Sequence, residues 1–340
     1  MFEKQIKIPE PEEILASMPL PASLKKIKAE RDKLVSDVIS GKSNKLIIIV
    51  GPCSAHEASP VLDYVERLGR LNEKVKDKLV LVPRIYTNKP RTRGVGYKGM
   101  FSQPDPAKSE DILKGIYAIR ELNIKAIEAS GLSAADEMLY PANIHYVDDL
   151  LSYIAVGARS SENQLHRLVA SGIDVPVGVK NPMSGSVMVM LNSIYAAQSG
   201  QVFKLNGWQV KTDGNPLAHA ILRGAVDGYG NDIPNFHYET VMQVVEGYSK
   251  SGLKNPAIII DANHSNSSKK YKQQIRICEE VMQNRLYDGD FKRNVKGFMI
   301  ESFIEEGNQD EDKVYGKSIT DPCLGWCDTE RLICDIAEKV

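Results

Sequence analysis

The sequence has few cysteines and no excess of charge of either sign. Five cysteines among 340 residues are too few, and odd in number, for the disulfide framework of a secreted domain. We therefore expect a cytoplasmic protein with reduced thiols. The net charge is only −1, from 43 basic and 44 acidic residues. Such a balance is not typical of proteins that bind nucleic acid or anionic membranes, so we expect neither as a partner.

A long apolar run and a dinucleotide-binding fingerprint are also missing. No run approaches the roughly 20 apolar residues that span a bilayer. The first 21 residues are mixed in charge and interrupted by proline, unlike a secretory signal peptide. The turn after the first apolar run reads GPCSAHEA (51–58), without the glycine pattern that a Rossmann fold requires at that point.

Short apolar, β-branched runs are present instead, separated by longer segments with helical spacing. Near-continuous apolar strands that alternate with helices indicate a parallel sheet covered on both faces. About eight such units favour a (β/α)8 TIM barrel, an α/β fold, over a doubly wound sheet. We expect the barrel strands at 46–51, 79–84, 132–139, 153–159, 175–181, 201–206, 256–264 and 295–302.

The remaining segments are assigned around this barrel. Helices are expected at 22–39, 109–130 and 269–285, and Ser109 is the expected N-cap of the second. Residues 1–40 are interpreted as an N-terminal arm that contributes to a homodimer or homotetramer, and residues 41–340 as the catalytic barrel. The Gly-rich segment 207–226 is expected to form an inserted hairpin.

Charged and sulfur-containing side chains gather where the apolar runs end. Reactive groups of barrel enzymes lie at the C-terminal ends of the strands, so these side chains should meet at one mouth. Several cations there would repel one another unless an anion such as a phosphate or carboxylate lay between them. The cationic set is Arg84, Lys89, Arg159, Lys180 and Arg223.

A second set combines sulfur, nitrogen and oxygen donors and has the composition of a transition-metal site. The members are distant in sequence, and a cysteine taken alone is more often a small buried apolar residue. We expect one divalent ion per subunit, with Mn²⁺ as the first choice and Fe²⁺, Co²⁺ or Zn²⁺ as alternatives, because this donor set does not select among them. The expected ligands are Cys53, His264, Glu301 and Asp321.

Several motifs together resemble one enzyme family. They are GPCS (51–54), KPRTRGVGYKG (89–99), GAR (157–159) with SSENQ (160–164), PVGVKN (176–181), ILRG (221–224), HSNSSK (264–269), ESFIEEGNQ (301–309) and GKSITDPCLGW (316–326). In this order they are similar to type I 3-deoxy-D-arabino-heptulosonate 7-phosphate (DAHP) synthases. These metal-dependent enzymes join phosphoenolpyruvate, D-erythrose 4-phosphate and water into DAHP and phosphate, at the first step of the shikimate pathway to aromatic amino acids.

The resemblance also implies roles for individual residues. Phosphoenolpyruvate would be bound by Arg84, Lys89, Arg159, Lys180 and Arg223, with the backbone of Ala158. Erythrose 4-phosphate would be bound by Pro90, Arg91, Thr92 and Asp321. Cys53 and His264 would be catalytic as ligands of the metal. From their own chemistry and position, we expect Lys89, between the two anion sites in sequence, to donate a proton and Glu137, at the end of the third strand, to position or activate water.

Two other functions remain open. The sister synthase uses arabinose 5-phosphate to make a 3-deoxy-octulosonate phosphate, and a barrel without activity would serve as a sensor of phosphorylated metabolites. Feedback is a separate question. Asp174 and Leu205 stand where members that are sensitive to aromatic amino acids have a small serine, so weak or no inhibition by phenylalanine is expected.

Overall fold

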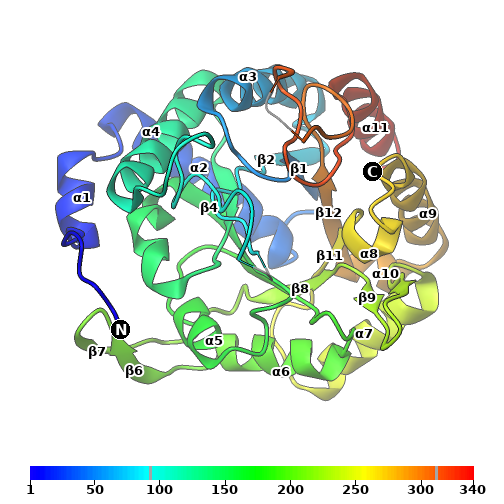
Figure 1. The fold of residues 1–340 in the computed structure, drawn as a ribbon. Coiled ribbons are helices and arrows are strands. Elements are labelled where there is room, and N and C mark those ends of the chain that lie inside the picture. Colours follow the sequence, from blue (N-terminus) through cyan, green and yellow to red (C-terminus); the bar gives the residue numbers. More distant parts are fainter. Residues whose placement is uncertain (92–93, 311–312) are drawn as a thin grey trace.

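The computed structural model describes residues 1–91, 94–310 and 313–340. Eight parallel strands curl into a nearly closed barrel, with helices around the outside (Figure 1). The strands pair in the order β2-β1-β12-β11-β8-β5-β4-β3. Between β2 and β3 the sheet is joined by a bridge in which Ile85 N donates to Ala135 O at 3.0 Å. The strands are β1 (Leu46–Gly51), β2 (Leu79–Pro83), β3 (Ala134–Glu137), β4 (Leu151–Val156), β5 (Val177–Lys180), β8 (His219–Leu222), β11 (Ile258–Asp261) and β12 (Val295–Glu301). The predicted TIM barrel is confirmed.

The outer helices are amphipathic and cover the apolar strands. In α3, for example, Tyr64, Leu68 and Leu71 share the buried face. The regular and 3-10 helices after the arm are α3 (Ala58–Val75), α4 (Ile112–Ser130), η1 (Pro141–Tyr146), η2 (Asp148–Leu150), α5 (Gln164–Ala170), α6 (Val187–Gln198), α7 (Tyr238–Lys250), α8 (His264–Ser267), α9 (Gln273–Tyr287), α10 (Gly289–Asn294) and α11 (Trp326–Glu338).

Two predicted helix starts were wrong. Helix α4 begins at Ile112, and Asp111 is its N-cap because the carboxylate accepts from Lys114 N at 3.1 Å. Ser109 lies outside this helix. Helix α9 begins at Gln273 because Ser268 and Lys269 adopt φ angles of 50° and 58°, which no α-helix accommodates.

The predicted sixth strand was also wrong. Residues 202–205 form β6 (Val202–Leu205), which pairs with β7 (Trp208–Lys211) in an antiparallel hairpin outside the barrel. The hairpin therefore begins earlier than the predicted segment 207–226. The barrel strand of this region is β8, which lies inside that segment. A second short hairpin joins β9 (Ala225–Val226) to β10 (Asp232–Ile233).

The N-terminal segment contains α1 (Pro11–Ser17) and α2 (Ala22–Ile39). Helix α2 covers the N-terminal end of the barrel, where Val35, Val38 and Ile39 belong to the same buried cluster as the strand residues inside the barrel. Arg31 of α2 donates to the carbonyl of Leu81. The mouth at the opposite end is thus the open end of the barrel. No helix of the described residues is long and apolar enough to cross a membrane.

Candidate active site

A cavity of about 400 Å³ opens at the C-terminal ends of the barrel strands. Because the strands are parallel and neighbouring, residues from distant parts of the chain meet there. All the predicted strand-end residues reach it except Glu301, which is fully buried beside it. The predicted residues that line the cavity are Cys53, Arg84, Lys89, Pro90, Arg91, Glu137, Ala158, Arg159, Lys180, Arg223, His264 and Asp321. Thr92 lies outside the described residues.

Cys53 follows β1 and is buried under the loop that carries Lys89. Its Sγ atom lies 2.7 Å from Lys89 Nζ and 3.4 Å from Asp321 Oδ2. Burial and the carboxylate of Glu301 raise the pKa of the Cys53 thiol, while the ammonium of Lys89 acts in the opposite direction. The Cys53 thiolate therefore depends on a positive partner, either an ammonium group or a metal ion.

Glu301 ends β12, and both of its oxygens have partners. Arg84 Nη2 donates to Oε1 at 3.0 Å, and Asn263 Nδ2 donates to Oε2 at 2.6 Å. Burial opposes ionisation of this carboxyl, but Arg84 and His264 outweigh it and keep its pKa below the usual value. Glu301 is thus held as a buried carboxylate in a fixed orientation.

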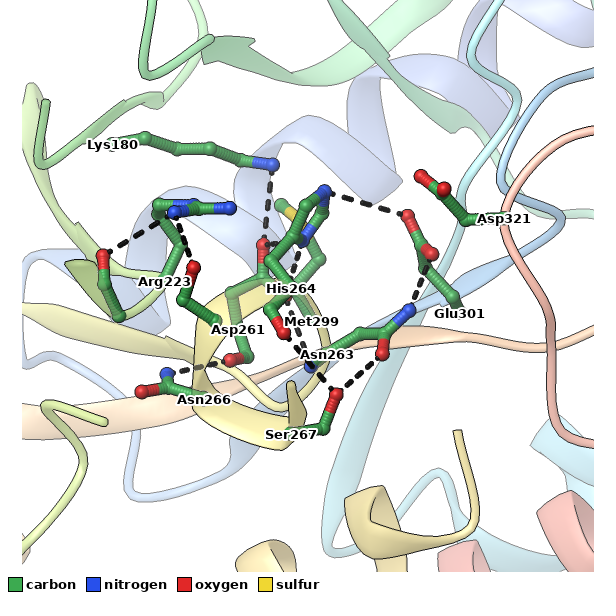
Figure 2. A network of polar contacts seen from close by, with 12 residues as sticks. Lys180, Arg223, Asp261, Asn263, His264, Asn266, Ser267, Met299, Glu301 and Asp321 are labelled. Carbon is green, nitrogen blue, oxygen red and sulfur yellow. Dashed lines mark hydrogen bonds and ion pairs between the residues drawn. The ribbon is translucent and has the colours of Figure 1, made fainter. Parts of the chain in front are cut away.

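His264 is oriented by Asp261, the last residue of β11 (Figure 2). Nδ1 of His264 lies 2.9 Å from Asp261 Oδ2, and Nε2 lies 3.8 Å from Glu301 Oε1. The residue has a φ of 53°, which turns the chain sharply after the strand. Burial opposes ionisation of Asp261, yet His264 and Lys180 lower its pKa well below its usual value. In metal-binding histidines, one ring nitrogen typically bonds a carboxylate while the other binds the metal. Here Nδ1 bonds Asp261, and Nε2 faces the carboxylate of Glu301.

Three of the four predicted donors have the spacing that a single metal ion requires. Cys53 Sγ and carboxylate oxygens of Glu301 and Asp321 all lie within 4.8 Å of one another. His264 is not part of this group, although its Nε2 atom lies 3.8 Å from Glu301 Oε1. Burial opposes ionisation of Asp321, but Lys89 and Lys269 hold its pKa below its usual value. Sulfur, imidazole and carboxylate donors together suit a divalent transition metal. The residues therefore fit such an ion.

Cationic side chains also line the cavity, beside the metal donors, and we call them the cationic wall. Lys180 at the end of β5 lies 3.2 Å from Asp261 Oδ2, and Arg223 Nη1 donates to Ser265 Oγ at 3.0 Å. Arg84 donates to Pro52 O and lies over the ring of Tyr86, 3.7 Å from its centroid. These contacts fix each charged group at the cavity, where it can bind an anion.

Lys89 lines the same cavity as the cationic wall and contacts two of the metal donors. Its Nζ atom is 3.3 Å from Asp321 Oδ2 in addition to its contact with Cys53. Burial opposes its charge, but Cys53 and Asp321 raise its pKa above the ordinary lysine value. Lys89 is therefore held as an ammonium that carries a proton into the cavity.

Two acids in this region were missed by the sequence analysis. Asp261 orients both His264 and Lys180, and its place at the end of an apolar run was a usable signal. Asp136 lies one residue before Glu137 on β3 and accepts from the backbone and hydroxyl of Thr87. It thereby fixes the start of the loop that leads to Lys89. The alternation of faces along β3 gave no sign of this contact.

Comparisons with known proteins agree with this geometry. The sequence profile of the DAHP synthetase I family matches residues 20–333. A Trp-sensitive phospho-2-dehydro-3-deoxyheptonate aldolase from Enterobacter agglomerans is 39% identical, over 97% of this chain and 94% of its own. A Phe-sensitive enzyme of the same name from Escherichia coli K12 is 38% identical, over 97% and 93%. The solved structure of this aldolase from Francisella tularensis SCHU S4 matches with a TM-score of 0.92 at 29% identity, over 100% of this chain and 98% of that one. The chain belongs to the DAHP synthetase I family.

Proposed function

We propose that the mouth cavity carries out the DAHP synthase reaction. Phosphoenolpyruvate, D-erythrose 4-phosphate and water give DAHP and phosphate. The observation that carries this proposal is that one cavity combines the cationic wall with a metal donor set that Lys89 contacts. Two phosphorylated substrates that react with each other require positive charge for both phosphates and polarisation of one carbonyl.

Phosphoenolpyruvate binds at the wall formed by Arg84, Arg159, Lys180 and Arg223, with Lys89 and the backbone of Ala158. Arginine supplies a planar fork for carboxylate or phosphate oxygens, and lysine supplies a point charge. Erythrose 4-phosphate binds through Pro90 and Arg91, together with Thr92 and Asp321. Arg91 lines the cavity with its Nε bonded to Tyr97 O at 2.8 Å, which directs the guanidinium.

Cys53, His264, Glu301 and Asp321 would hold a divalent metal ion, which would supply a Lewis acid for the aldehyde oxygen. Mn²⁺ is the proposed ion, with Fe²⁺, Co²⁺ and Zn²⁺ as alternatives. C3 of phosphoenolpyruvate attacks the aldehyde carbon, and the positive character left at C2 captures water. Collapse of the hemiketal phosphate then expels phosphate.

Two side chains move the protons. Lys89 donates from Nζ to the oxygen of the former aldehyde, because its raised pKa keeps the proton in place until an alkoxide forms. Glu137 positions the water and accepts its proton. Its carboxylate faces Gly157, where a Cβ atom would lie 2.1 Å from Oε1, so glycine leaves room for this acid.

The proposal extends to assembly and location: the subunits assemble as a homodimer or homotetramer in the cytoplasm.

The test is an assay of phosphate release and DAHP formation with Mn²⁺ and both substrates. Arabinose 5-phosphate in place of erythrose 4-phosphate tests the sister synthase, and we expect much slower turnover with it. Tight binding of phosphoenolpyruvate without phosphate release would instead support a sensor of phosphorylated metabolites and contradict the proposal.

A further inference from the structure

A second cavity lies at the N-terminal end of the barrel, opposite the mouth. It has a volume of about 610 Å³, within the usual range for small-molecule sites. It is placed where β1, β11 and β12 begin, three strands that are consecutive in the barrel (Figure 1). We call it the lower cavity. Its charged lining residues are Lys45, Arg285, Lys292, Arg293 and Lys296.

The charge of the lower cavity is one-sided. None of the described residues that line it is acidic. Arg293 has a partner, Asp290. Among the described residues, no side-chain carboxylate forms an ion pair with any of the other four cations. Elsewhere lysines on exposed helix faces commonly have one, as in the pairs Lys125–Glu121 and Lys250–Glu246. In a chain of net charge −1, this cluster is not explained by a general basic surface.

Two of these cations, Lys45 and Arg285, are held in place by neutral groups. Arg285 donates to the carbonyls of Lys292, at 2.8 Å, and Val295. Lys45 Nζ donates to Lys76 O at 2.6 Å. Carbonyl partners orient these charges without neutralising them. Burial lowers the pKa of Lys296, and the nearby guanidinium of Arg285 lowers it further. The lower cavity therefore gathers positive charge at an electrostatic cost that an anion would remove.

The number of cations indicates the class of ligand. A phosphate ester carries about 1.5 to 2 negative charges near neutral pH. Four cations without an acidic partner therefore match two phosphate groups rather than one. The adjoining recess, lined by Lys45, Lys78 and Lys292 but also by Asp77, extends the basic surface only partly. A cluster of this size, confined to one recess, suits a small molecule better than a polymer.

We propose that the lower cavity binds a small anion with two phosphate groups. This site is separate from the mouth, since β1, β11 and β12 contribute their N-terminal ends here and their C-terminal ends there. Lys292 and Lys296 provide the charges on the side of α10 and β12, and Lys45 provides one on the side of β1. The two sides are far enough apart in sequence that only the folded barrel forms the site.

The experiment is a calorimetric titration with fructose 1,6-bisphosphate as the probe. The Mn²⁺-loaded enzyme is first saturated with phosphoenolpyruvate, which fills its own part of the mouth. Arg91→Ala is titrated alongside, because it weakens the remaining phosphate-binding part of the mouth. We expect one saturable site per chain that is present in both proteins. The double variant Lys292→Ala/Lys296→Ala should bind at least about tenfold more weakly, since each charge-assisted contact accounts for roughly a factor of 10 to 100. Lys292→Arg, which keeps the charge, should bind as the wild type does.

A matched control removes the same amount of charge from exposed helix faces. Lys125→Ala/Lys250→Ala should bind the bisphosphate like the wild type. Equal affinity of the Lys292→Ala/Lys296→Ala variant and the wild type, or no saturable binding to the wild type, would overturn the proposal. So would tighter binding of single-stranded DNA through the same lysines. If phosphoenolpyruvate does not occupy the mouth, two binding events should appear, and the double variant should lose only one.

Discussion

At the scale of single residues, the mouth depends on charges that stabilise one another. Cys53 is buried with an ammonium at 2.7 Å, and Glu301 is buried with a guanidinium at 3.0 Å. Removing one member of such a pair leaves the other charge buried and uncompensated, which costs several kcal/mol. Substitutions here should therefore be read with a stability measurement beside each activity measurement.

The first prediction concerns the metal ligands. Cys53→Ala and His264→Ala should each lose bound metal and turnover, because each removes one strong donor from the site. A chelator should abolish the activity of the wild type, and Mn²⁺ or Co²⁺ should restore it. Metal content, circular dichroism and phosphate release are the measurements. Cys334→Ala, a cysteine on α11 away from the cavity, is the control and should keep both metal and activity. Full activity of metal-stripped Cys53→Ala would exclude the assigned site.

The second prediction concerns the division of the cavity between the two substrates. Arg159→Ala should raise the KM for phosphoenolpyruvate about 10- to 100-fold, since one charge-assisted contact is worth about 1.5–3 kcal/mol. Its effect on erythrose 4-phosphate should be small. Arg91→Ala should have the reverse pattern. Initial rates with each substrate varied in turn give the KM for both substrates in each variant. Equal changes in the two KM values would show that the division of the cavity is wrong.

At the scale of elements, most barrel strands were predictable, but β6 of the hairpin was mistaken for a barrel strand and the barrel strand β8 for part of the hairpin. Buried parallel strands are apolar throughout, so β1 and β11 could be found from composition alone. Three of the four residues of 202–205 are also apolar, but Val202 and Lys204 are exposed while Phe203 and Leu205 are partly buried. This alternation, followed by Asn206 and Gly207, is the pattern of a hairpin with a tight turn. Both turn residues have positive φ, at 46° and 84°.

The site was predictable in its composition but not in its contacts. Strand ends bring Cys53, Lys180 and Glu301 to one mouth because every strand of the barrel runs in the same direction. The partner of each group could not be read from sequence. Asp261 bonds His264 only because the chain turns at a left-handed residue, and Asp136 bonds Thr87 across two strands. Such contacts depend on loop conformations that no periodicity encodes.

The third prediction concerns feedback and the hairpin β6–β7. The hairpin is fastened to the end of α5, where Ser171 and Thr212 hydroxyls lie 2.6 Å apart. Asp174 follows Ser171 closely in sequence and is exposed, and Leu205 of β6 packs against the core. A carboxylate at 174 would repel the carboxylate of an amino acid, so phenylalanine should inhibit weakly or not at all. Initial rates measure this, and half-inhibition at micromolar phenylalanine would contradict it. Asp174→Ser/Leu205→Ser should increase the sensitivity.

At the scale of the whole molecule, two buried groups link folding to pH in opposite directions. Burial lowers the pKa of His219 to about 4. The ring is held neutral between Leu217 O, at 2.8 Å from Nδ1, and the hydroxyl of Tyr153, at 2.7 Å from Nε2. Burial raises the pKa of Asp136 to about 7, although Thr87 donates two hydrogen bonds to it. Each group therefore titrates at a different pH in the folded and unfolded chain.

The sign of each contribution follows from the state that binds the proton. Below its ordinary pKa of 6.5, His219 is protonated only in the unfolded chain, so stability is lost as the pH falls from about 6.5 towards 4. Asp136 is protonated only in the folded chain between its ordinary value of 3.8 and about 7, so its contribution to stability is lost as the pH rises through that range. Between pH 7 and pH 5 each group changes the free energy of unfolding by about 2 kcal/mol, and the two changes nearly cancel.

The fourth prediction is that single substitutions reveal these two opposing effects. His219→Gln removes the group that disfavours folding in acid, so the free energy of unfolding relative to the wild type should rise by about 2 kcal/mol between pH 7 and pH 5. Asp136→Asn should change the same difference by a similar amount in the opposite direction. Urea unfolding at both pH values measures this, because other titrating groups are common to all three proteins and cancel in the comparison. Changes of the same sign in both variants would contradict the assignment, since only groups with oppositely shifted pKa values give slopes of opposite sign.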